Sequence, residues 1–572
     1  MKFAALLAAL VIVAGSFQIT RPGYSVDEEF TEFAVRGIHA QGVPILPSGF
    51  LYDRGLAYSY ASALLNGRVV SLISAALVVL LTFMLVRRYV NPTAGLLAAV
   101  LVTASVPFWA TATTARFYAP FLATFLAALV MINRPLMLIA IALLARLLHE
   151  LGFLIAAIPF ISMLFARGQR RTWLLSTAAV VAGLVLGQLL LFAMHALEPS
   201  SGETMVRRFF LWQVVNLFER PGDRQFGIAL VVAVVGMVIA PKHAWWWLVS
   251  GLSIAVMIVA FSIARASNTA ALSIELITQV LGDGARYPLD MFWHIARTTP
   301  LTLTVAVGTL ALRFLRFGGE WRPAERAAHV FWIGWVLWFG VIESGITTNY
   351  LLLPISFMLI AIAIDIDSIV RRGGTLVPPV GRSSTSALRA SADKKDRPLR
   401  TAALALIVAA IALDQWRGEG SIVERLEAAR PTIHIEGIDE IRDSLQPNDR
   451  VVCTDELGCL MLVGRIDRWL ALDDYVRERF LVRRSANRVT GVYTGVPAVF
   501  RPGEVFSPNA DGSLPDRTIV IDIFKDYPIG NSRSWLPKAI EEDGLQVKPL
   551  LETPQARVLQ VSPPERQAHL QP

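Results

Sequence analysis

Residues 67–86 read GRVVSLISAALVVLLTFMLV, an apolar run that is followed directly by Arg87 and Arg88. A helix needs about 20 apolar residues to cross a bilayer, so this run predicts a membrane-spanning helix. Twelve further runs lie near 3–20, 93–110, 118–133, 135–148, 151–166, 173–194, 226–241, 244–263, 291–315, 328–343, 350–370 and 401–415. Several of these runs are shorter than a full span, and the boundaries within 118–166 are the least defined.

The composition extends this interpretation to the whole chain. Of its 572 residues, 54% are hydrophobic and 17% are charged, and the mean hydropathy is +0.52. Soluble domains carry about 25% charged residues. The net charge of +8 does not indicate nucleic-acid binding, because Arg and Lys lie mostly in short loops between apolar runs. We therefore predict an α-helical polytopic membrane protein with about 13 transmembrane helices and no nucleic-acid partner.

The basic loops predict the orientation, since short cytoplasmic loops carry an excess of Lys and Arg. With a cytoplasmic N-terminus, every even-numbered run ends at a basic loop, the last being the 371–400 linker, rich in Ser, Gly and Pro. The segments 21–66, 111–117, 195–225, 264–290, 344–349 and the tail from 416 then lie outside, with the 149–150 junction. Residues 3–20 fit a cleaved signal peptide or a first helix, and their length favours a retained helix.

The tail differs in character from the membrane module of residues 1–415. Its strand-like runs at 450–453 and 518–524 alternate with helical patterns at 455–463 and 534–542, which predicts a soluble α/β domain over 416–572. The only two cysteines, Cys453 and Cys459, are close enough to pair if the tail lies in an oxidising compartment. A structural role for this domain is favoured over a catalytic one.

The first outside loop, residues 21–66, carries the acidic run Asp27-Glu28-Glu29 directly after the first membrane helix. At the bilayer surface, Asp27 is placed to act as a general base on an acceptor hydroxyl, and Glu28 to bind a divalent cation or a sugar hydroxyl. The competing interpretation is structural: Ser25 caps a helix, and the three acids lie in its first turn, where negative charge suits the helix dipole.

Four other groups of polar residues fall on the same predicted side. Arg116 and Tyr118 can clamp a phosphate or form an interfacial anchor. His149 and Glu150, between two apolar runs, can ligate a metal, orient substrates or simply break two short helices. Arg286 offers a second cation for a phosphate or belongs to a polar turn. Tyr350, where a helix re-enters the membrane, is a candidate substrate-binding residue or an aromatic belt residue.

Together these segments resemble the GT-C fold, and more narrowly the bacterial branch that contains the lipid A aminoarabinose transferase and relatives of the protein O-mannosyltransferases. The resemblance covers about residues 1–370 and rests on short motifs: Val26-Asp27-Glu28 with Gly42-Val-Pro44, Arg116-Phe-Tyr118, His149-Glu150-Leu-Gly152, and Asn349-Tyr350 through Pro354. It implies a polyprenyl-phosphate sugar donor, an inverting reaction and a catalytic carboxylate at Asp27, with metal dependence that varies among members. Many relatives carry Arg-Tyr where this chain has Asn349-Tyr350, which moves the phosphate role to Arg116 or Arg286.

The sequence thus predicts an inverting glycosyltransferase of the cytoplasmic (inner) membrane. Its partners are a polyprenyl-phosphate-linked sugar, membrane lipids and an acceptor lipid, polysaccharide or protein, and a divalent metal ion is a candidate cofactor. The alternatives are a transporter or flippase for a lipid-linked or anionic substrate, and a non-catalytic scaffold that displays the α/β domain. A transporter is less favoured, because the charges gather at one surface and no internal repeat is found.

Overall fold

The structure, a computed structural model, divides into two compact units. It describes residues 1–20, 24–156, 158, 170–197, 203–204, 295, 299–317, 325, 327–329, 331–333, 352–373, 405–416, 432–433, 438–472, 481–485, 488–508, 512–523, 526–527, 530–531, 535–553 and 556–563. The first unit comprises Met1–Ile19, Arg68–Gln188 and Trp212–Leu426, and the second comprises Thr20–Gly67, Leu189–Leu211 and Glu427–Pro572.

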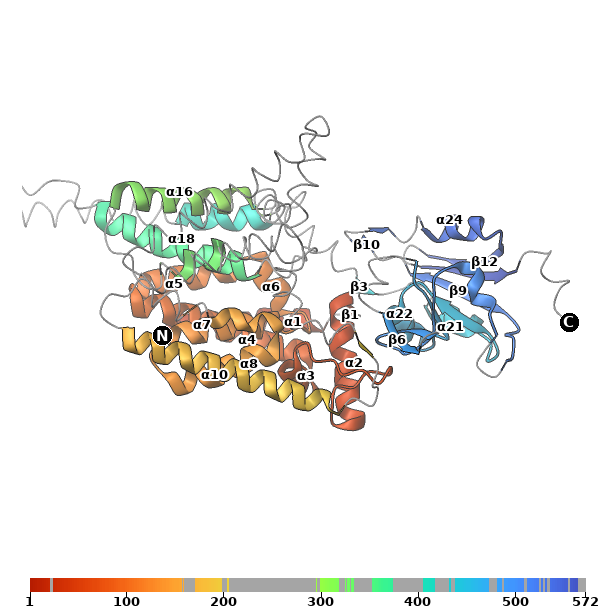
Figure 1. Cartoon of the computed structure of the whole chain (residues 1–572). Coiled ribbons are helices and arrows are strands. Elements are labelled where there is room, and N and C mark those ends of the chain that lie inside the picture. Colours follow the sequence, from red (N-terminus) through yellow and green to blue (C-terminus); the bar gives the residue numbers. More distant parts are fainter. Residues whose placement is uncertain are drawn as a thin grey trace, which may run out of the picture. The chain divides into compact units, whose positions relative to one another are not determined.

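The first unit is helical (Figure 1). Its elements are α1 (Lys2–Ile19), α4 (Gly67–Tyr89), α5 (Pro92–Thr103), α6 (Val106–Ala112), α7 (Tyr118–Val130), α8 (Pro135–Leu148), the 3-10 helix η1 (Glu150–Ala156), α10 (Arg170–His195), α16 (Pro300–Phe317), α18 (Leu352–Gly373) and the helix Ala405–Trp416. Within the described residues, three helices are long and apolar enough to cross a membrane, or four if a bent pair is one span. The predicted runs at 226–241 and 244–263 lie outside the described residues, so the count of thirteen stays a prediction.

The run predicted at 93–110 is a bent pair of helices in the structure. α5 and α6 meet at an angle of 69°. Ser105 caps α6 by accepting a hydrogen bond from the Phe108 N–H, and Pro107 in the first turn of α6 has no N–H for a continuous helix. Side chains from the helix Ala405–Trp416 satisfy the exposed backbone, since Gln415 accepts from the Val106 N–H at 3.1 Å.

Hydrogen bonds mark the two ends of the helical unit. At the start of α4, Arg68 donates to the Ile19 carbonyl at 3.1 Å, and the Ser71 hydroxyl donates to the Arg116 carbonyl at 3.0 Å. At the end of α4, Arg88 donates to the Val130 carbonyl. Seventeen residues separate Ser71 from Arg88, which is about 25 Å along a helix and close to the thickness of the bilayer core. Arg116 therefore lies at the end of the unit opposite to the basic Arg88.

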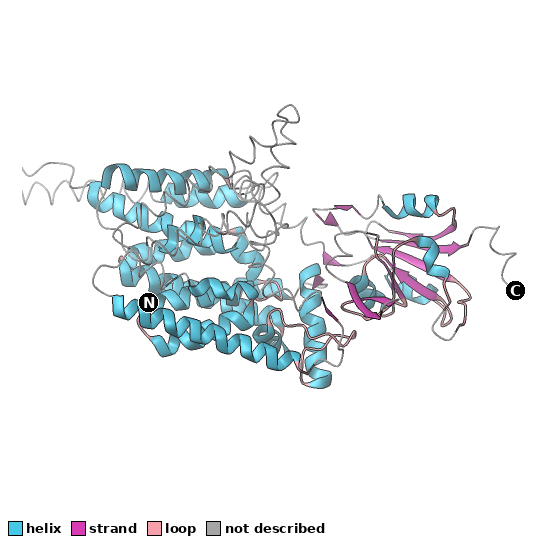
Figure 2. Cartoon of the chain, viewed as in Figure 1, coloured by secondary structure: helices cyan, strands magenta, loops and turns pink. Residues whose placement is uncertain are grey.

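The second unit holds the strands of the chain (Figure 2). Its elements are β1 (Tyr24–Ser25), α2 (Val26–Gln41), α3 (Leu56–Leu65), β2 (Glu203–Thr204), β3 (Thr432–Ile433), α21 (Ile438–Ser444), β4 (Arg450–Cys453), α22 (Glu456–Gly458), η5 (Cys459–Val463), β5 (Arg468–Leu470), β6 (Leu481–Ser485), β7 (Arg488–Gly491), β8 (Ala498–Val499), η6 (Pro502–Phe506), β9 (Thr518–Ile523), β10 (Asp526–Tyr527), β11 (Gly530–Asn531), α24 (Trp535–Glu542), β12 (Gln546–Glu552) and β13 (Ala556–Ser562).

The main sheet has six strands in the order β12-β13-β9-β4-β5-β8. β4 pairs in parallel with β9 and β5, and β5 with β8, while β13 and β12 are antiparallel at one edge. The strand predicted at 450–453 is confirmed with the same bounds, and the one predicted at 518–524 ends one residue earlier. The prediction of a C-terminal α/β domain is confirmed.

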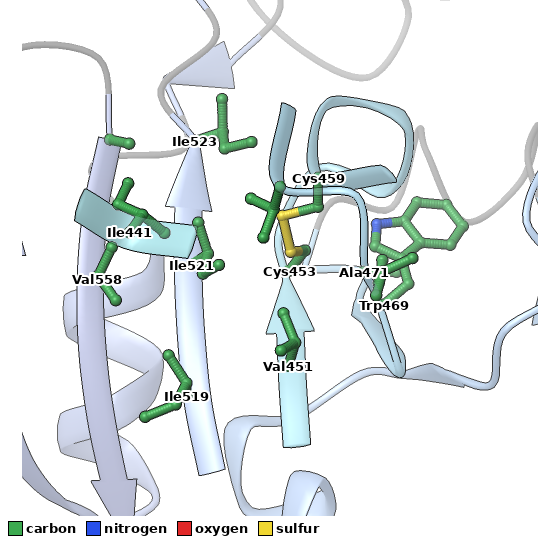
Figure 3. Close-up of a cluster of buried hydrophobic side chains, with 13 residues drawn as sticks. Ile441, Val451, Cys453, Cys459, Trp469, Ala471, Ile519, Ile521, Ile523 and Val558 are labelled. Carbon is green, nitrogen blue, oxygen red and sulfur yellow. A yellow bond between two sulfur atoms is a disulfide. The ribbon is translucent and has the colours of Figure 1, made fainter. Parts of the chain in front are cut away.

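Both faces of this sheet are covered, as parallel strands require. Val451 and Cys453 point into one buried cluster, and Val452 between them points into the other. In the first cluster, Cys453 and Cys459 form a disulfide, drawn in Figure 3 beside Ile521 and Trp469. The pairing that the sequence allowed is therefore present, and it ties η5 to the end of β4.

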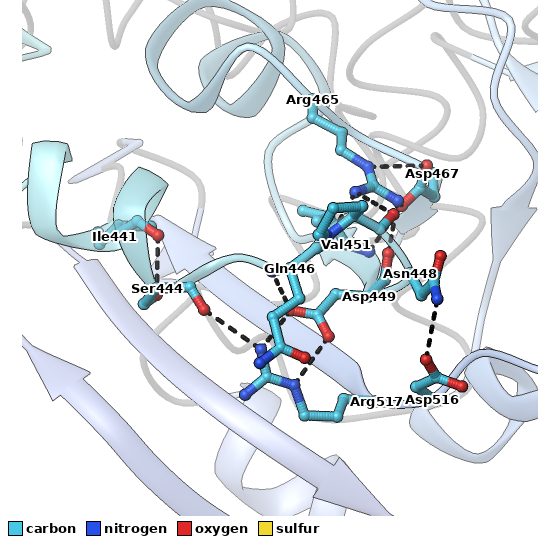
Figure 4. A network of polar contacts seen from close by, with 11 residues as sticks. Ile441, Ser444, Gln446, Asn448, Asp449, Val451, Arg465, Asp467, Asp516 and Arg517 are labelled. Carbon is cyan, nitrogen blue, oxygen red and sulfur yellow. Dashed lines mark hydrogen bonds and ion pairs between the residues drawn. The ribbon is translucent and has the colours of Figure 1, made fainter.

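A polar network closes the amino end of β4 (Figure 4). Arg517 pairs with the buried Asp449 at 2.5 Å, and the Gln446 N–H donates to the same carboxylate at 2.7 Å. Burial raises the pKa of Asp449, but the hydrogen bonds from Arg517 and Gln446 outweigh it, and the net pKa is lowered. The network therefore stabilises the charged carboxylate and fixes the start of two parallel strands.

The first loop folds with the C-terminal domain. β1 pairs with β3, and β2 pairs with β6. Side chains of the loop and of the domain share one buried cluster: Phe33, Ala34, Leu46, Phe50, Tyr52, Leu457 and Val492. The sequence grouped residues 21–66 with the membrane module, whereas the structure groups Thr20–Gly67 with the C-terminal domain, because this apolar surface can be buried only against a folded partner. The first loop, residues 203–204 and the C-terminal domain therefore belong to one compact unit, and the side of the membrane on which it lies stays a prediction.

Candidate active site

Arg116 is a buried cation of the predicted site. It lies between α6 and α7, 5% exposed, and its guanidinium carbon is 4.9 Å from the centroid of the Phe117 ring. Ser71 of α4 holds its carbonyl, as described above. Because the first loop leaves the helical unit at Ile19 and returns at Arg68, and these two residues are hydrogen-bonded, Arg116 lies at the end to which the acidic loop is attached.

Aromatic rings connect Arg116 to two other predicted residues. The Phe117 ring centroid is 4.9 Å from that of Tyr118 and 4.9 Å from that of His149. The His149 ring centroid is also 5.3 Å from that of Phe121 of α7. The structure therefore brings His149, from a separate segment of the sequence, next to Phe117, whose two sequence neighbours are Arg116 and Tyr118.

His149 is held by the way in which α8 ends. It is 4% exposed, and its N–H donates to the Ala145 carbonyl at 3.0 Å. The chain then turns into η1, and Gly152 comes so close to Ala145 that a Cβ would overlap the carbonyl group. One turn before His149, Arg146 donates two hydrogen bonds to the Gln188 side-chain oxygen of α10, at 2.9 and 2.7 Å. These contacts fix the backbone position from which the His149 side chain projects.

The acidic residues of the first loop belong to α2. Asp27 is in the first turn of this helix and Glu28 follows it, with the Glu28 side chain buried. The first-turn position agrees with the structural interpretation of the acidic run, in which the helix dipole favours negative charge. The role of Asp27 as a general base stays a prediction.

The remaining predicted residues are less defined by the structure. Glu150 begins η1, but its side chain is not among those described, and Arg286 and Tyr350 lie outside the described residues. Within the described part of the chain, no group of three or more His, Cys, Asp or Glu side chains could hold a metal ion. The metal-binding role of His149 and Glu150 therefore stays a prediction.

This arrangement suits an anionic ligand that arrives from the membrane. A guanidinium presents several donors to phosphate oxygens, and it keeps its charge when it is buried. Aromatic rings beside it provide a surface for an apolar chain or for the face of a sugar. Arg116, Tyr118 and His149 can thus bind a phosphate and contact the group that it carries.

Comparisons with solved structures relate the whole chain to known proteins. ArnT from Cupriavidus metallidurans bound to undecaprenyl phosphate is 14% identical with a TM-score of 0.45, and 98% of each chain is covered. The archaeal oligosaccharyltransferase AglB from Archaeoglobus fulgidus, in complex with an inhibitory peptide and a dolichol-phosphate, is 13% identical with a TM-score of 0.44, over 95% of this chain and 72% of that one. The chain resembles GT-C fold membrane glycosyltransferases. No protein-family model matches the sequence, and no curated protein does either.

Sequence reasoning missed one ionisable pair inside the helical unit. His329 lies 3.2 Å from the Asp365 carboxylate of α18, and the Trp332 indole N–H donates to the other ring nitrogen of His329 at 3.2 Å. Since Nδ1 accepts this hydrogen bond, the proton of a neutral imidazole lies on Nε2 and is directed at Asp365. The signal for this pair was a carboxylate within the apolar run at 350–370, because an ionisable side chain in a membrane-spanning segment has a large free-energy cost.

Proposed function

We propose that this chain is a membrane glycosyltransferase that moves a sugar from a polyprenyl-phosphate donor to an acceptor at the outer face of the cytoplasmic membrane. One observation carries the proposal: Arg116 is buried among Phe117, Tyr118 and His149 at the end of the helical unit to which the acidic first loop is attached. A guanidinium presents several donors that match phosphate oxygens, and it keeps its charge when it is buried. The phosphate of a lipid carrier is an anion that reaches this position from within the membrane.

The proposed reaction is a single displacement. Asp27 accepts the proton of an acceptor hydroxyl, the hydroxyl oxygen forms a bond to C1 of the sugar, and the bond from C1 to the phosphate oxygen breaks. The lipid phosphate leaves with the electron pair, and Arg116 balances its charge, together with Arg286. Attack opposite to the leaving group inverts the configuration at C1.

Two features support an outer-face location. Cys453 and Cys459 form a disulfide, a bond that persists in oxidising compartments and is rare in the cytosol. The first loop packs against the same domain, so both belong on the side where this bond is stable. The acceptor in this proposal is a lipid, polysaccharide or protein that carries a free hydroxyl or amine.

A divalent metal ion is a separate part of the proposal. His149 and Glu150 are its candidate ligands, with Glu28 as a further carboxylate, and no step above is routed through the metal. The transfer assay is therefore run with EDTA and with added Mg²⁺ or Mn²⁺. Loss of transfer in EDTA and its return with metal would assign the cofactor, and unchanged transfer would remove it.

The test of the proposal is Asp27→Asn in the full-length protein, assayed for release of polyprenyl phosphate from a sugar-loaded donor. Removal of a general base is expected to lower turnover by about 10²- to 10⁴-fold. Glu32→Gln is the matched control, because Glu32 is a carboxylate on the same helix whose exposed pair with Arg36 contributes little. Near wild-type turnover in Asp27→Asn would remove Asp27 from the mechanism.

The same preparation distinguishes the transporter or flippase. In liposomes, a flippase would move the intact lipid-linked sugar to the opposite leaflet and leave the bond to phosphate unbroken. Donor movement without cleavage would therefore replace the proposed function, and cleavage with transfer would support it. Arg116→Gln is expected to raise the KM for the donor, since it removes the charge that meets the phosphate.

A further inference from the structure

The parallel strands of the C-terminal domain create an edge that usually binds ligands. The chain runs from β4 outward to β5 and β8 and then returns to β9 on the other side of β4. In open α/β sheets, the crevice beyond the carboxyl ends of the strands at such a switch point is the usual binding position. Thr454, Asp455 and Glu456 follow β4 at this edge, and Thr454 donates to Asp522 at the end of β9 at 2.9 Å.

In this chain, the first loop covers that edge. Leu457, the residue after Glu456, is buried with Phe33 of α2 and with Val492, in the cluster described above. The Ser48 N–H donates to the Tyr493 carbonyl at 3.0 Å, and the Ser48 hydroxyl donates to the Val492 carbonyl. The Phe30 ring of α2 lies 5.0 Å from that of Tyr493. Residues 492–493 therefore connect the α/β domain to the helix that carries Asp27.

Glu456 holds the turn that contains these residues. Its Oε1 accepts hydrogen bonds from the Thr494 N–H at 2.7 Å and from the Thr494 hydroxyl at 2.5 Å. The turn is closed by hydrogen bonds from the Gly491 N–H to Val496 and from the Gly495 N–H to Gly491. At Gly491 a Cβ would overlap the Glu456 carboxylate, so the turn approaches this side chain as closely as the backbone allows.

The buried position of Glu456 lowers the stability of the C-terminal domain. The side chain is 4% exposed, and burial raises its pKa to about 7, against the hydrogen bonds from Thr494 and with the help of the nearby Asp455. A buried carboxyl group that is partly charged at neutral pH costs stability, and such groups concentrate where they serve function. Its hydrogen bonds all go to the turn that contacts the first loop.

We propose that Glu456 is a positioning residue for the active site: by holding residues 491–496 against Ser48 and Phe30, it fixes α2 and thereby the direction of Asp27. The crevice at the switch point then seats a segment of the same chain, where other α/β domains seat a ligand. This inference rests on the proposed function, because it assigns to the C-terminal domain the task of orienting the general base.

The experiment compares Glu456→Leu, Glu456→Gln and Glu504→Leu in the full-length protein. Leucine removes both acceptors at 456, and glutamine keeps the oxygen that faces Thr494. Glu504 is the matched control, because it caps η6 through the Phe500 and Arg501 N–H groups and lies near the amino end of the sheet. Each variant is measured for kcat, for donor KM and for hydrogen exchange of α2 by mass spectrometry.

The expected result is a selective loss. Glu456→Leu lowers kcat at least tenfold with donor KM within twofold of wild type, and amides of α2 exchange at least tenfold faster. Glu456→Gln stays within threefold of wild type in kcat, and Glu504→Leu changes neither kcat nor α2 exchange. If Glu456→Leu does not accumulate, Thr494→Val replaces it, because this variant removes one donor and leaves the carboxylate. It is expected to lower kcat about threefold and to speed the exchange of α2 amides about threefold.

Other outcomes separate the two proposals. Unchanged α2 exchange in Glu456→Leu overturns the positioning role, whatever the activity. Equal losses in Glu456→Leu and Glu504→Leu also overturn it, since they indicate general destabilisation of the domain. If α2 loosens in Glu456→Leu while Asp27→Asn transfers normally, the positioning contact stands and the proposed role of Asp27 fails.

Discussion

Replacing Glu456 by glutamine should make the C-terminal domain more stable at alkaline pH, because a buried carboxyl group resists losing its proton. Burial is the main cause of the raised pKa of Glu456, about 7 in the folded protein compared with 4.5 for a free side chain. The hydrogen bonds from Thr494 act in the opposite direction but are too weak to restore the ordinary value. Glutamine keeps nearly the same shape and has no proton to lose in this range.

The direction and the size of the effect follow from proton linkage. Between pH 4.5 and 7, the unfolded chain has released this proton while the folded chain still holds it, so the free energy of unfolding falls as pH rises. Each pKa unit corresponds to about 1.36 kcal/mol, and the full difference is about 3 kcal/mol. Wild type and Glu456→Gln should therefore be equally stable near pH 4.5, and the variant should be more stable by up to about 3 kcal/mol at pH 8.

Hydrogen exchange of the full-length protein in detergent measures this difference locally. Peptides that cover β4 should lose protection in the wild type between pH 5 and 8, after correction for the intrinsic exchange rate. In Glu456→Gln the protection of these peptides should not change with pH. At pH 8 the protection factors of the variant should exceed those of the wild type by up to about two orders of magnitude. Glu504→Gln controls for the loss of a carboxylate from the same domain. Parallel pH profiles for wild type and Glu456→Gln would refute the reasoning.

Three further changes test the C-terminal domain and the active site. The double variant Cys453→Ala/Cys459→Ala opens a small loop, since the cysteines are six residues apart, and should lower the free energy of unfolding by about 2 kcal/mol; an unchanged melting temperature would contradict this. Arg517→Leu leaves the buried Asp449 without its ion pair and should lower the free energy of unfolding by about 3 kcal/mol at pH 7. Since the pKa of Asp449 is lowered, that loss should shrink as pH falls below about 4, and a loss independent of pH would argue against the ion pair. Gly152→Ala places a Cβ against a carbonyl of α8 and should lower sugar transfer at least tenfold with normal folding; full activity would show that the turn after α8 is not needed.

Much of the helical unit could be predicted from apolar runs alone. The runs at 67–86 and 135–148 correspond to α4 and α8, because a stretch that is apolar on all sides and flanked by charge has few alternatives to a helix in a membrane. The bend between α5 and α6 was not predicted, although Ser105 and Pro107 are local signals for it, and the contacts of Gln415 and Trp416, from a helix about 300 residues later, could not be predicted. Contacts at such separation leave no periodic signal.

The candidate site was only partly accessible to sequence reasoning. Arg116, Tyr118 and His149 were selected because charge and aromatic residues are unusual between apolar runs, and the structure places them around Phe117. Glu456 was not among the residues selected from the sequence. Its role depends on the turn at 491–496, to which it has no relation in the linear sequence.

The sequence by itself determined that this protein belongs in a bilayer and that its tail is an α/β domain, and it predicts which loops share a side. Those properties follow from local patterns, because the hydrophobic effect and the charge of short loops act on each segment separately. Only the tertiary structure decided that the first loop belongs with the C-terminal domain and that a buried glutamate holds the turn that seats it. Such contacts depend on the shape and polarity of surfaces that exist only after both segments have folded.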